Sequence, residues 1–274
     1  MAHVIAFANH KGGVGKTTGT ANLGAALAQM GKRVLLIDGD PQSNLSEAFG
    51  VDDPTTPGLR LEDALAPTHW SAPPAVWTTR SDAETGVEVP LAGGVHLLPC
   101  TAELANTAAA LVLEDGAERR LRDVVALYSE HYDWILIDTP PGLGALSSMA
   151  MLAARWIIVP ARPADFDIGG AVKVADLLEH EIIEFNPDVE LLGVLVSQAD
   201  RRWNLGHESR SALKQSEIAR LDVEIPFAVR VGSAPRYGAP TVVLEPDSRV
   251  GRAYQRLARH LLEQLGDAPR RAAA

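Results

Sequence analysis

Residues 9–18 of this chain read NHKGGVGKTT, and they decide the fold. The short apolar run Val4–Ala8 precedes them, and residues 21–28, which have the pattern of a helix, follow. A strand, a glycine-rich loop and a helix in this order form the context of a phosphate-binding loop. Glycines let successive backbone N–H groups converge on one anion, and the N-terminus of the following helix adds a partial positive charge. We therefore predict that this stretch binds the phosphates of a nucleotide.

Two side chains of the loop have predicted roles. Lys16 is expected to reach the β- and γ-phosphates, and the Thr17 hydroxyl is expected to bind Mg²⁺. The strict pattern G-x-x-x-x-G-K-[ST] fails, because its first glycine falls on His10 and a second lysine, Lys11, precedes the paired glycines. A glycine-rich turn that binds nothing is the alternative. The predicted nucleotide-binding set is Lys11, Gly12, Gly13, Val14, Gly15, Lys16, Thr17 and Thr18.

Two later apolar runs end in acids. Residues 33–38 read RVLLID and residues 134–138 read WILID, and Asp40 follows Asp38 after one glycine. In open α/β sheets, ligands bind at the carboxyl ends of the strands, so Asp38, Asp40 and Asp138 are expected to face the loop. A carboxylate there holds Mg²⁺ through water or orients an attacking water. The alternative for Asp38 and Asp40 is a turn with helix-capping acids.

The whole chain alternates short β-branched runs with helical patterns. This order predicts a single-domain α/β fold with a mostly parallel twisted sheet and helices on both faces. Further strands are expected at 95–99, 156–160 and 190–196. Helices are expected near 60–66, after Thr101, and over 118–131, 168–185 and 248–265.

Length and composition agree with that architecture. The 274 residues, 46% hydrophobic and 22% charged, suffice for one domain with a substantial core, predicted to span 1–265. Proline-rich residues 50–94 are interpreted as a variable loop or small hairpin, with a partner-specific surface as the alternative, and residues 266–274 as a disordered tail. The lone Cys100 excludes an intramolecular disulfide, and no run of about 18 apolar residues exists to cross a membrane. The expected compartment is the cytoplasm.

Charge is unevenly distributed along the chain. The net charge is −10, yet residues 197–274 hold 13 Lys and Arg against 9 Asp and Glu, a balance of +4. Residues 1–196 carry the balance of −14. A locally basic C-terminal third on an acidic body permits a DNA-binding face without proving one.

The loop with Lys11 before its paired glycines resembles the deviant Walker A motif of the ParA/MinD family. The Asp38–Gln42 stretch resembles the family's second switch segment, and Asp138–Gly142 resembles its other switch, which follows the Walker B strand. This resemblance implies an ATPase that binds ATP or ADP with Mg²⁺ and hydrolyses ATP slowly. It also implies a homodimer on ATP binding, in which Lys11 reaches the partner's nucleotide. Asp40 is then expected to position water, with Thr17, Asp38 and Asp138 serving the metal.

Two later segments are similar to chromosomal partition ATPases. Residues 200–205 resemble their Asp-x-Arg-x-Asn-Leu stretch, and residues 225–238 resemble their Ile-Pro-Arg-x-x-Arg segment, with Phe227 in place of the usual arginine. The likeness implies that Arg202 and Arg230 bind DNA non-specifically, by neutralising phosphates. It also implies a ParB-like centromere-binding partner and a nucleoid-associated location. A solvated basic face, or ion pairs with neighbouring acids, is the alternative for each arginine.

Other members of the same superfamily remain as alternatives. A MinD-like regulator requires a C-terminal basic amphipathic helix with exposed Leu or Phe, which the tail after Leu265 lacks. An ATPase that positions protein cargo would use the same residues. A dethiobiotin synthetase-type enzyme lacks the extra lysine, and the nitrogenase iron protein needs cysteines for its cluster. Where the family often has a glutamine after the strand at 156–160, this chain has Ala161-Arg162-Pro163.

Overall fold

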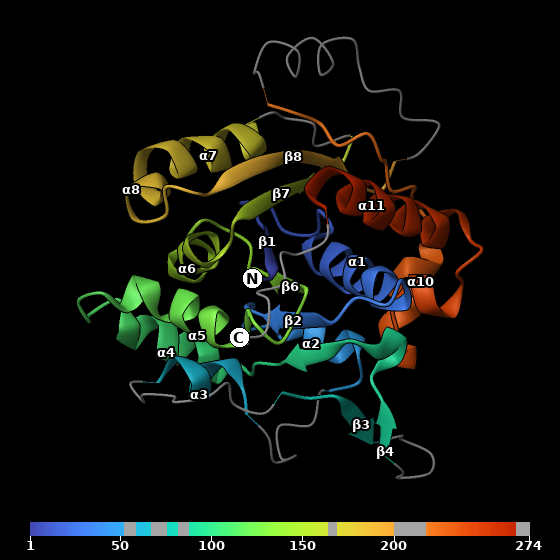
Figure 1. Cartoon of the computed structure of the whole chain (residues 1–274), viewed down its shortest axis with the longest axis horizontal. Coiled ribbons are helices and arrows are strands. Elements are labelled where there is room, and N and C mark those ends of the chain that lie inside the picture. The colour runs from blue at the N-terminus through green and yellow to red at the C-terminus, as the bar shows by residue number, and fades with distance from the viewer. Residues whose placement is uncertain (52–58, 67–75, 82–87, 164–168, 200–217, 267–274) are drawn as a thin grey trace, which may run out of the picture.

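The computed structural model describes residues 1–51, 59–66, 76–81, 88–163, 169–199 and 218–266. Within these residues one sheet of six strands has the order β5-β2-β6-β1-β7-β8, and every neighbouring pair is parallel (Figure 1). The predicted α/β fold with a parallel sheet is confirmed. The strands are β1 (His3–Phe7), β2 (Val34–Asp38), β5 (His96–Leu98), β6 (Trp134–Asp138), β7 (Trp156–Ala161) and β8 (Glu190–Val196).

Helices cover both faces of the sheet, and this explains the nearly continuous apolar strands. Alternate side chains of β1 enter two separate cores: Ile5 and Phe7 pack with α1 and α11, whereas Val4 and Ala6 pack on the other side with α3 to α7. Figure 1 shows these two layers on either side of the strands. The helices are α1 (Lys16–Gln29), α2 (Asn44–Ala48), α3 (Leu61–Leu65), α4 (Glu103–Leu111), α5 (Arg120–Tyr128), α6 (Ala145–Ala153), α7 (Gly169–Leu177), α8 (Ile183–Phe185), α10 (Thr241–Leu244) and α11 (Arg249–Leu265).

The proline-rich residues 50–94 contain a small hairpin, which was one of the two structures predicted for them. Strands β3 (Thr79–Ser81) and β4 (Glu88–Pro90) pair antiparallel. Trp77 precedes this hairpin in the chain. Its backbone N–H donates to the Leu97 carbonyl at 2.8 Å and its indole donates to the Leu59 carbonyl at 3.2 Å, so it joins the edge of the main sheet. Trp70 lies outside the described residues.

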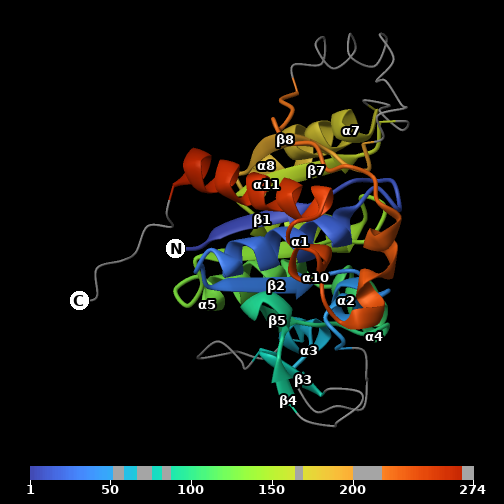
Figure 2. The same cartoon turned by 90° about the vertical axis from the view of Figure 1, so that its right-hand side faces the viewer.

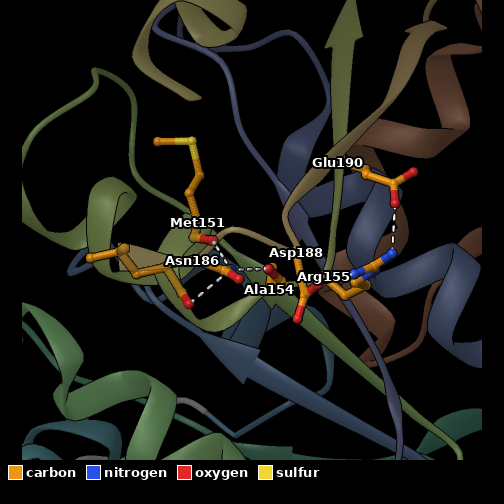
Figure 3. Close-up of polar contacts among 7 residues, drawn as sticks. Met151, Ala154, Arg155, Asn186, Asp188 and Glu190 are labelled. Carbon is orange, nitrogen blue, oxygen red and sulfur yellow. Dashed lines mark hydrogen bonds and ion pairs between the residues drawn. The ribbon is translucent and has the colours of Figure 1, made fainter. Parts of the chain in front are cut away.

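The amino ends of the strands are closed by paired polar groups. Arg155, just before β7, forms ion pairs with Asp188 at 3.1 Å and with Glu190 at 2.6 Å (Figure 3). The Asn186 side-chain amide donates to carbonyls at the end of α6, the shortest bond being 2.8 Å to Ala154. These bonds satisfy carbonyls that a helix end leaves without partners.

The carboxyl ends of the strands meet at the opposite edge. In Figure 2 strands β1 and β2 run from left to right, so their carboxyl ends lie at the right, beside α2. Helix α1 begins at that edge directly after residues 9–15. Every predicted site residue of the first 138 positions therefore belongs to one edge of the sheet.

Candidate nucleotide-binding site

The loop between β1 and α1 has the backbone that its glycines predict. Gly13 (φ 68°) and Gly15 (φ 96°) adopt left-handed conformations, and Gly15 is the N-cap of α1. Only glycine adopts such angles readily. The Val14 side chain is buried beneath the loop, whereas Gly12 and Gly13 are exposed. The strand, loop and helix order predicted from residues 4–28 is confirmed.

Two acids lie side by side at the ends of neighbouring strands. Asp38 and Asp138 are direct register partners at the ends of β2 and β6. The Gly39 N–H then donates to the Asp138 carbonyl at 3.1 Å. A Cβ at position 39 would lie 2.5 Å from that carbonyl oxygen, so the close approach needs glycine. The sequence analysis did not identify Gly39 as a site residue. Its position between two acids after a strand could have indicated that glycine is required there.

Asp138 has the features of a cation ligand. It is fully buried, and its Oδ2 accepts a hydrogen bond from the Thr17 hydroxyl at 2.5 Å. Its Oδ1 is buried and has no hydrogen-bond partner among the described residues. Burial, reinforced by the neighbouring Asp38, raises the pKa of Asp138 well above its ordinary value. A buried carboxylate with one free oxygen beside a hydroxyl fits a Mg²⁺ ion, which binds oxygen ligands.

Asp38 is held differently. Its Oδ2 accepts from the Ser46 backbone N–H at 2.8 Å and from the Ser46 hydroxyl at 2.7 Å, and its Oδ1 accepts from the Asp40 N–H at 3.3 Å. Burial raises its pKa to about 6 despite these bonds. Ser46 lies eight positions downstream with no local pattern to mark it, and sequence reasoning missed it. The supporting role of Asp38 at the metal stays a prediction.

Asp40 is buried at the mouth of the same site. Its Oδ1 accepts from the Gln42 N–H at 3.0 Å, and its backbone carbonyl accepts from the Cys100 thiol at 3.0 Å. Burial raises the pKa of that thiol. Asp40 also lines the cleft described below, next to the loop. This position is compatible with its predicted part in orienting water.

Lys16 is a cation close enough to Asp138 and Asp40 to interact with their charges. It is buried, and its Nζ donates to the Lys11 carbonyl at 3.1 Å. Burial lowers the pKa of Lys16, and the charges of Asp138 and Asp40 act in the opposite direction. Lys11 is half-buried, and its N–H donates to the Asn9 side chain at 3.0 Å.

The ends of β7 and β8 hold the loop from outside. The Ser197 hydroxyl donates to the Val14 carbonyl at 2.6 Å, and the Gln198 amide donates to the Gly13 carbonyl at 3.0 Å. Arg162 donates to the same Gly13 carbonyl from Nε at 2.8 Å and from Nη2. Sequence reasoning noted Arg162 only as a departure from the family pattern and missed the other two, which lie more than 180 positions away from the loop.

A cleft of about 390 Å³ follows the loop. Its lining includes the loop residues Gly12, Lys16, Thr17 and Thr18 and, from the C-terminal part of the chain, Val231, Ala234, Ala239 and Pro240. A lining that combines backbone donors with apolar side chains matches the two halves of a nucleotide.

Of the two predicted DNA-binding arginines, only Arg230 belongs to the described residues, and it does not line this cleft. Arg230 is 80% exposed, and its guanidinium forms an ion pair with Glu245 at the end of α10. The Glu245 pairing raises the pKa of Arg230. Arg202 lies outside the described residues.

Comparisons with known proteins place the chain in a family. The family model described as an AAA domain matches residues 2–191. The chain is 34% identical over 273 residues to the chromosome partitioning protein ParA of Caulobacter vibrioides, which covers 98% of this chain and 97% of that protein. The chain belongs to the ParA/MinD family of ATPases.

Two solved structures show the same fold. Cobyrinic acid a,c-diamide synthase from Mycobacterium smegmatis, crystallised with an ATP analogue and magnesium, has a TM-score of 0.77 and 28% identity over 100% of both chains. The cell division ATPase MinD of Pyrococcus furiosus has a TM-score of 0.72 and 27% identity over 97% of this chain and 100% of that one. The resemblance predicted from residues 9–18, 38–42 and 138–142 is confirmed.

The described residues contain no group of three or more His, Cys, Asp or Glu side chains placed to hold a metal. Magnesium at a phosphate site keeps several waters and uses one or two carboxylates, so it does not require such a group. No helix in the same residues is long and apolar enough to span a bilayer.

Proposed function

We propose that this chain binds and hydrolyses ATP with Mg²⁺ and that the bound nucleotide switches a DNA-binding dimer used in partition. One observation carries the nucleotide assignment. The Thr17 hydroxyl, at the start of α1, lies 2.5 Å from a fully buried carboxylate oxygen of Asp138, whose other oxygen has no partner among the described residues. This arrangement leaves negative charge that a metal ion would balance, and the metal would in turn bind the phosphates of a nucleotide.

The residues divide the chemistry between them. Thr17 and Asp138 would hold Mg²⁺, with Asp38 supporting them, and the metal when bound supplies neutralisation of phosphate charge. Lys16 would contact the β- and γ-phosphates from the buried floor of the loop. Asp40 would orient the water that attacks the γ-phosphate, because it lines the cleft together with the loop and its Oδ1 is fixed by the Gln42 N–H.

Gly12 supports the proposed ATP-dependent dimer. A Cβ at this position would meet only the Pro141 Cβ, at an ordinary 3.8 Å, and its φ does not require glycine. The single chain thus has space for a side chain where the sequence has none. A second copy approaching the exposed Gly12 backbone, with Lys11 crossing to its phosphates, would explain the glycine. Gly12→Ala should keep the monomer intact, and Gly12→Val should block dimerisation in light scattering.

A row of arginines supports the DNA-binding part of the proposal. Residues three, four and three positions apart share one face of a helix. Four exposed arginines of α11 have this spacing, and none forms an ion pair with a described residue. The opposite face of α11 is buried in the core, so it is not available to enter a membrane. The arginines are Arg249, Arg252, Arg256 and Arg259.

The predicted positions Arg202 and Arg230 remain part of the proposed DNA face. Arg230 would exchange Glu245 for a phosphate, which costs little because exposed ion pairs are weak. Dimerisation would double the phosphate contacts and raise DNA affinity only in the ATP state. A ParB-like partner would then stimulate hydrolysis and release the dimer, and the chain would work on the nucleoid in the cytoplasm.

A mobility shift on non-specific duplex DNA tests this proposal. Wild type is compared with ATP, ADP and no nucleotide at two salt concentrations, beside Arg202→Glu, Arg230→Glu and a double Arg252→Glu, Arg256→Glu variant. The matched control is Arg119→Glu, an exposed arginine on the opposite side of the sheet. We expect binding only with ATP, weakened by salt and lost in the three test variants. No binding in any state contradicts the DNA assignment, and ATP turnover only with a small carboxylate or amine would favour a synthetase.

A further inference from the structure

The carbonyl of Gly13 is the most heavily bonded group of the phosphate loop. Arg162 donates to it from both Nε and Nη2, and Gln198 donates to it from Nε2 at 3.0 Å. These donors come from the carboxyl ends of β7 and β8, which are neighbours in the sheet. Two side chains far downstream in the chain therefore converge on one peptide group of the loop.

This convergence fixes the direction of a backbone donor. A trans peptide is planar, so its carbonyl and the following N–H point to opposite sides. Because the Gly13 carbonyl is held toward Arg162 and Gln198, the Val14 N–H points away from these two side chains. The Ser197 hydroxyl on the Val14 carbonyl, at 2.6 Å, has the same effect on the Gly15 N–H. Two consecutive N–H groups are thus aimed together, as an anion-binding nest requires.

Charge adds to the geometry at Gly13. The guanidinium makes charge-assisted hydrogen bonds, which are stronger than neutral ones and polarise the peptide they reach. The glycine at position 13 is explained by its φ of 68°, which side chains rarely adopt. The glutamine that the family often has after this strand would supply a donor without the positive charge.

We propose that Arg162 is a positioning residue for nucleotide, which holds the Gly13 carbonyl outward and so presents the Val14 N–H to the bound phosphates. The inference rests on the nucleotide binding proposed above. It assigns to Arg162 an effect on the diphosphate part of the ligand, because backbone N–H groups of such loops contact the α- and β-phosphates. ADP and ATP affinity should then depend equally on Arg162, and the rate of the bound complex should not.

The test compares Arg162→Gln and Arg162→Lys with wild type. The matched control is Arg155→Gln, a partly exposed arginine at the amino end of the same strand, whose ion pairs with Asp188 and Glu190 are drawn in Figure 3. We expect Arg162→Gln to weaken ADP and ATP binding by about tenfold in calorimetry, the loss of one charge-assisted bond. For Arg162→Gln, KM should rise by a similar factor with kcat nearly unchanged. Arg162→Lys should recover part of the nucleotide affinity, and Arg155→Gln should bind nucleotide as wild type does.

Thermal unfolding separates positioning from a merely structural role. Without nucleotide, the Arg162→Gln midpoint should equal that of wild type, whereas the upward shift produced by ADP should shrink. An unchanged ADP affinity in Arg162→Gln overturns the inference, and so does a fall in kcat without a change in KM. If wild type itself binds neither ADP nor ATP, the proposed function fails. If wild type binds nucleotide and Arg162→Gln binds it equally well, only the inference about Arg162 fails.

Discussion

The two ends of strand β6 treat an aspartate in opposite ways. Asp133, just before the strand, is matched by Arg33, whose Nη2 lies 2.8 Å from Oδ1 and whose backbone N–H donates to Oδ2 at 2.9 Å. Asp138, at the other end, is fully buried next to Asp38, and one of its oxygens has no partner among the described residues. The negative charge of the aspartate is thus paired at the amino end of the sheet and left unpaired among the described residues at the carboxyl end.

Asp133 therefore serves the stability of the fold, whereas Asp138, at the other end of β6, serves the functional site. Burying like charges together costs free energy that a structural site would avoid. In the pair of Arg33 with Asp133, the aspartate is buried but its charge is compensated by a bonded guanidinium. The excess negative charge at the carboxyl end is tolerated because a ligand that carries positive charge is expected there. The four predictions that follow test this contrast.

The largest effect is expected from Lys16→Ala. Lys16 is the buried cation beside Asp138 and Asp40, and phosphates would contact it directly. We expect nucleotide affinity to fall by more than about a hundredfold, measured by calorimetric titration with ATP and ADP. Lys173→Ala, which changes an exposed lysine on α7, is the matched control and should bind as wild type does. Equal ATP affinity in both variants refutes the loop assignment.

Asp40→Ala should affect turnover and leave binding in place. Loss of the residue that orients the attacking water is expected to lower kcat by about 10²–10⁴. ATP-dependent dimerisation should persist, and DNA should stay bound, because the ATP state no longer decays. Phosphate release and light scattering measure the two properties. If this variant hydrolyses ATP at the wild-type rate, another group positions the water.

The two aspartates of β6 should respond with opposite signs. In the absence of nucleotide and Mg²⁺, Asp138→Asn removes a buried charge beside Asp38 and should raise the free energy of unfolding by about 1–2 kcal/mol. Asp133→Asn leaves Arg33 without its carboxylate and should lower the free energy of unfolding by about 1–3 kcal/mol, because Asp133 is buried and accepts hydrogen bonds from Arg33. Urea unfolding measures both. A destabilised Asp138→Asn protein would mean that the carboxyl end is as well satisfied as the amino end.

The smallest effect concerns His96, at the amino end of β5. Its Nδ1 lies 2.7 Å from the Tyr132 hydroxyl, and burial lowers its pKa. The unfolded chain, with an ordinary histidine pKa of 6.5, therefore binds more protons than the folded chain just below pH 6.5. Stability is lost as pH falls through that window. Urea unfolding between pH 5 and 7 should show a weaker pH dependence for His96→Gln than for wild type, and equal slopes would contradict this account.

Local sequence patterns predicted most of the fold and the centre of the site. Residues 9–18 and the acids that end β2 and β6 were identified because each depends on a short run of neighbouring residues. Asp38 and Asp138 could be placed together because parallel strands share an edge. The sequence could not predict that Ser46 holds Asp38 or that Trp77 joins β5.

The contacts that were missed depend on tertiary distance. Arg162 and Gln198 reach Gly13 from 149 and 185 positions away, and no periodicity records such a meeting. The importance of Gly39 could not be predicted for a related reason: a side chain at position 39 would clash only with the backbone of β6, which is far away in the sequence. Arg202 lies outside the described residues, so its DNA contact stays a prediction.

The most direct test of the central contrast is the magnesium dependence of ATP binding at the two ends of β6. Calorimetric titrations with ATP, in excess Mg²⁺ or in excess EDTA, are run on wild type, Asp138→Asn and Asp133→Asn. We expect Mg²⁺ to tighten ATP binding at least about tenfold in wild type and in Asp133→Asn, and we expect Asp138→Asn to lose this gain. An unchanged gain in Asp138→Asn, or equal affinity with and without Mg²⁺ in wild type, would contradict this expectation.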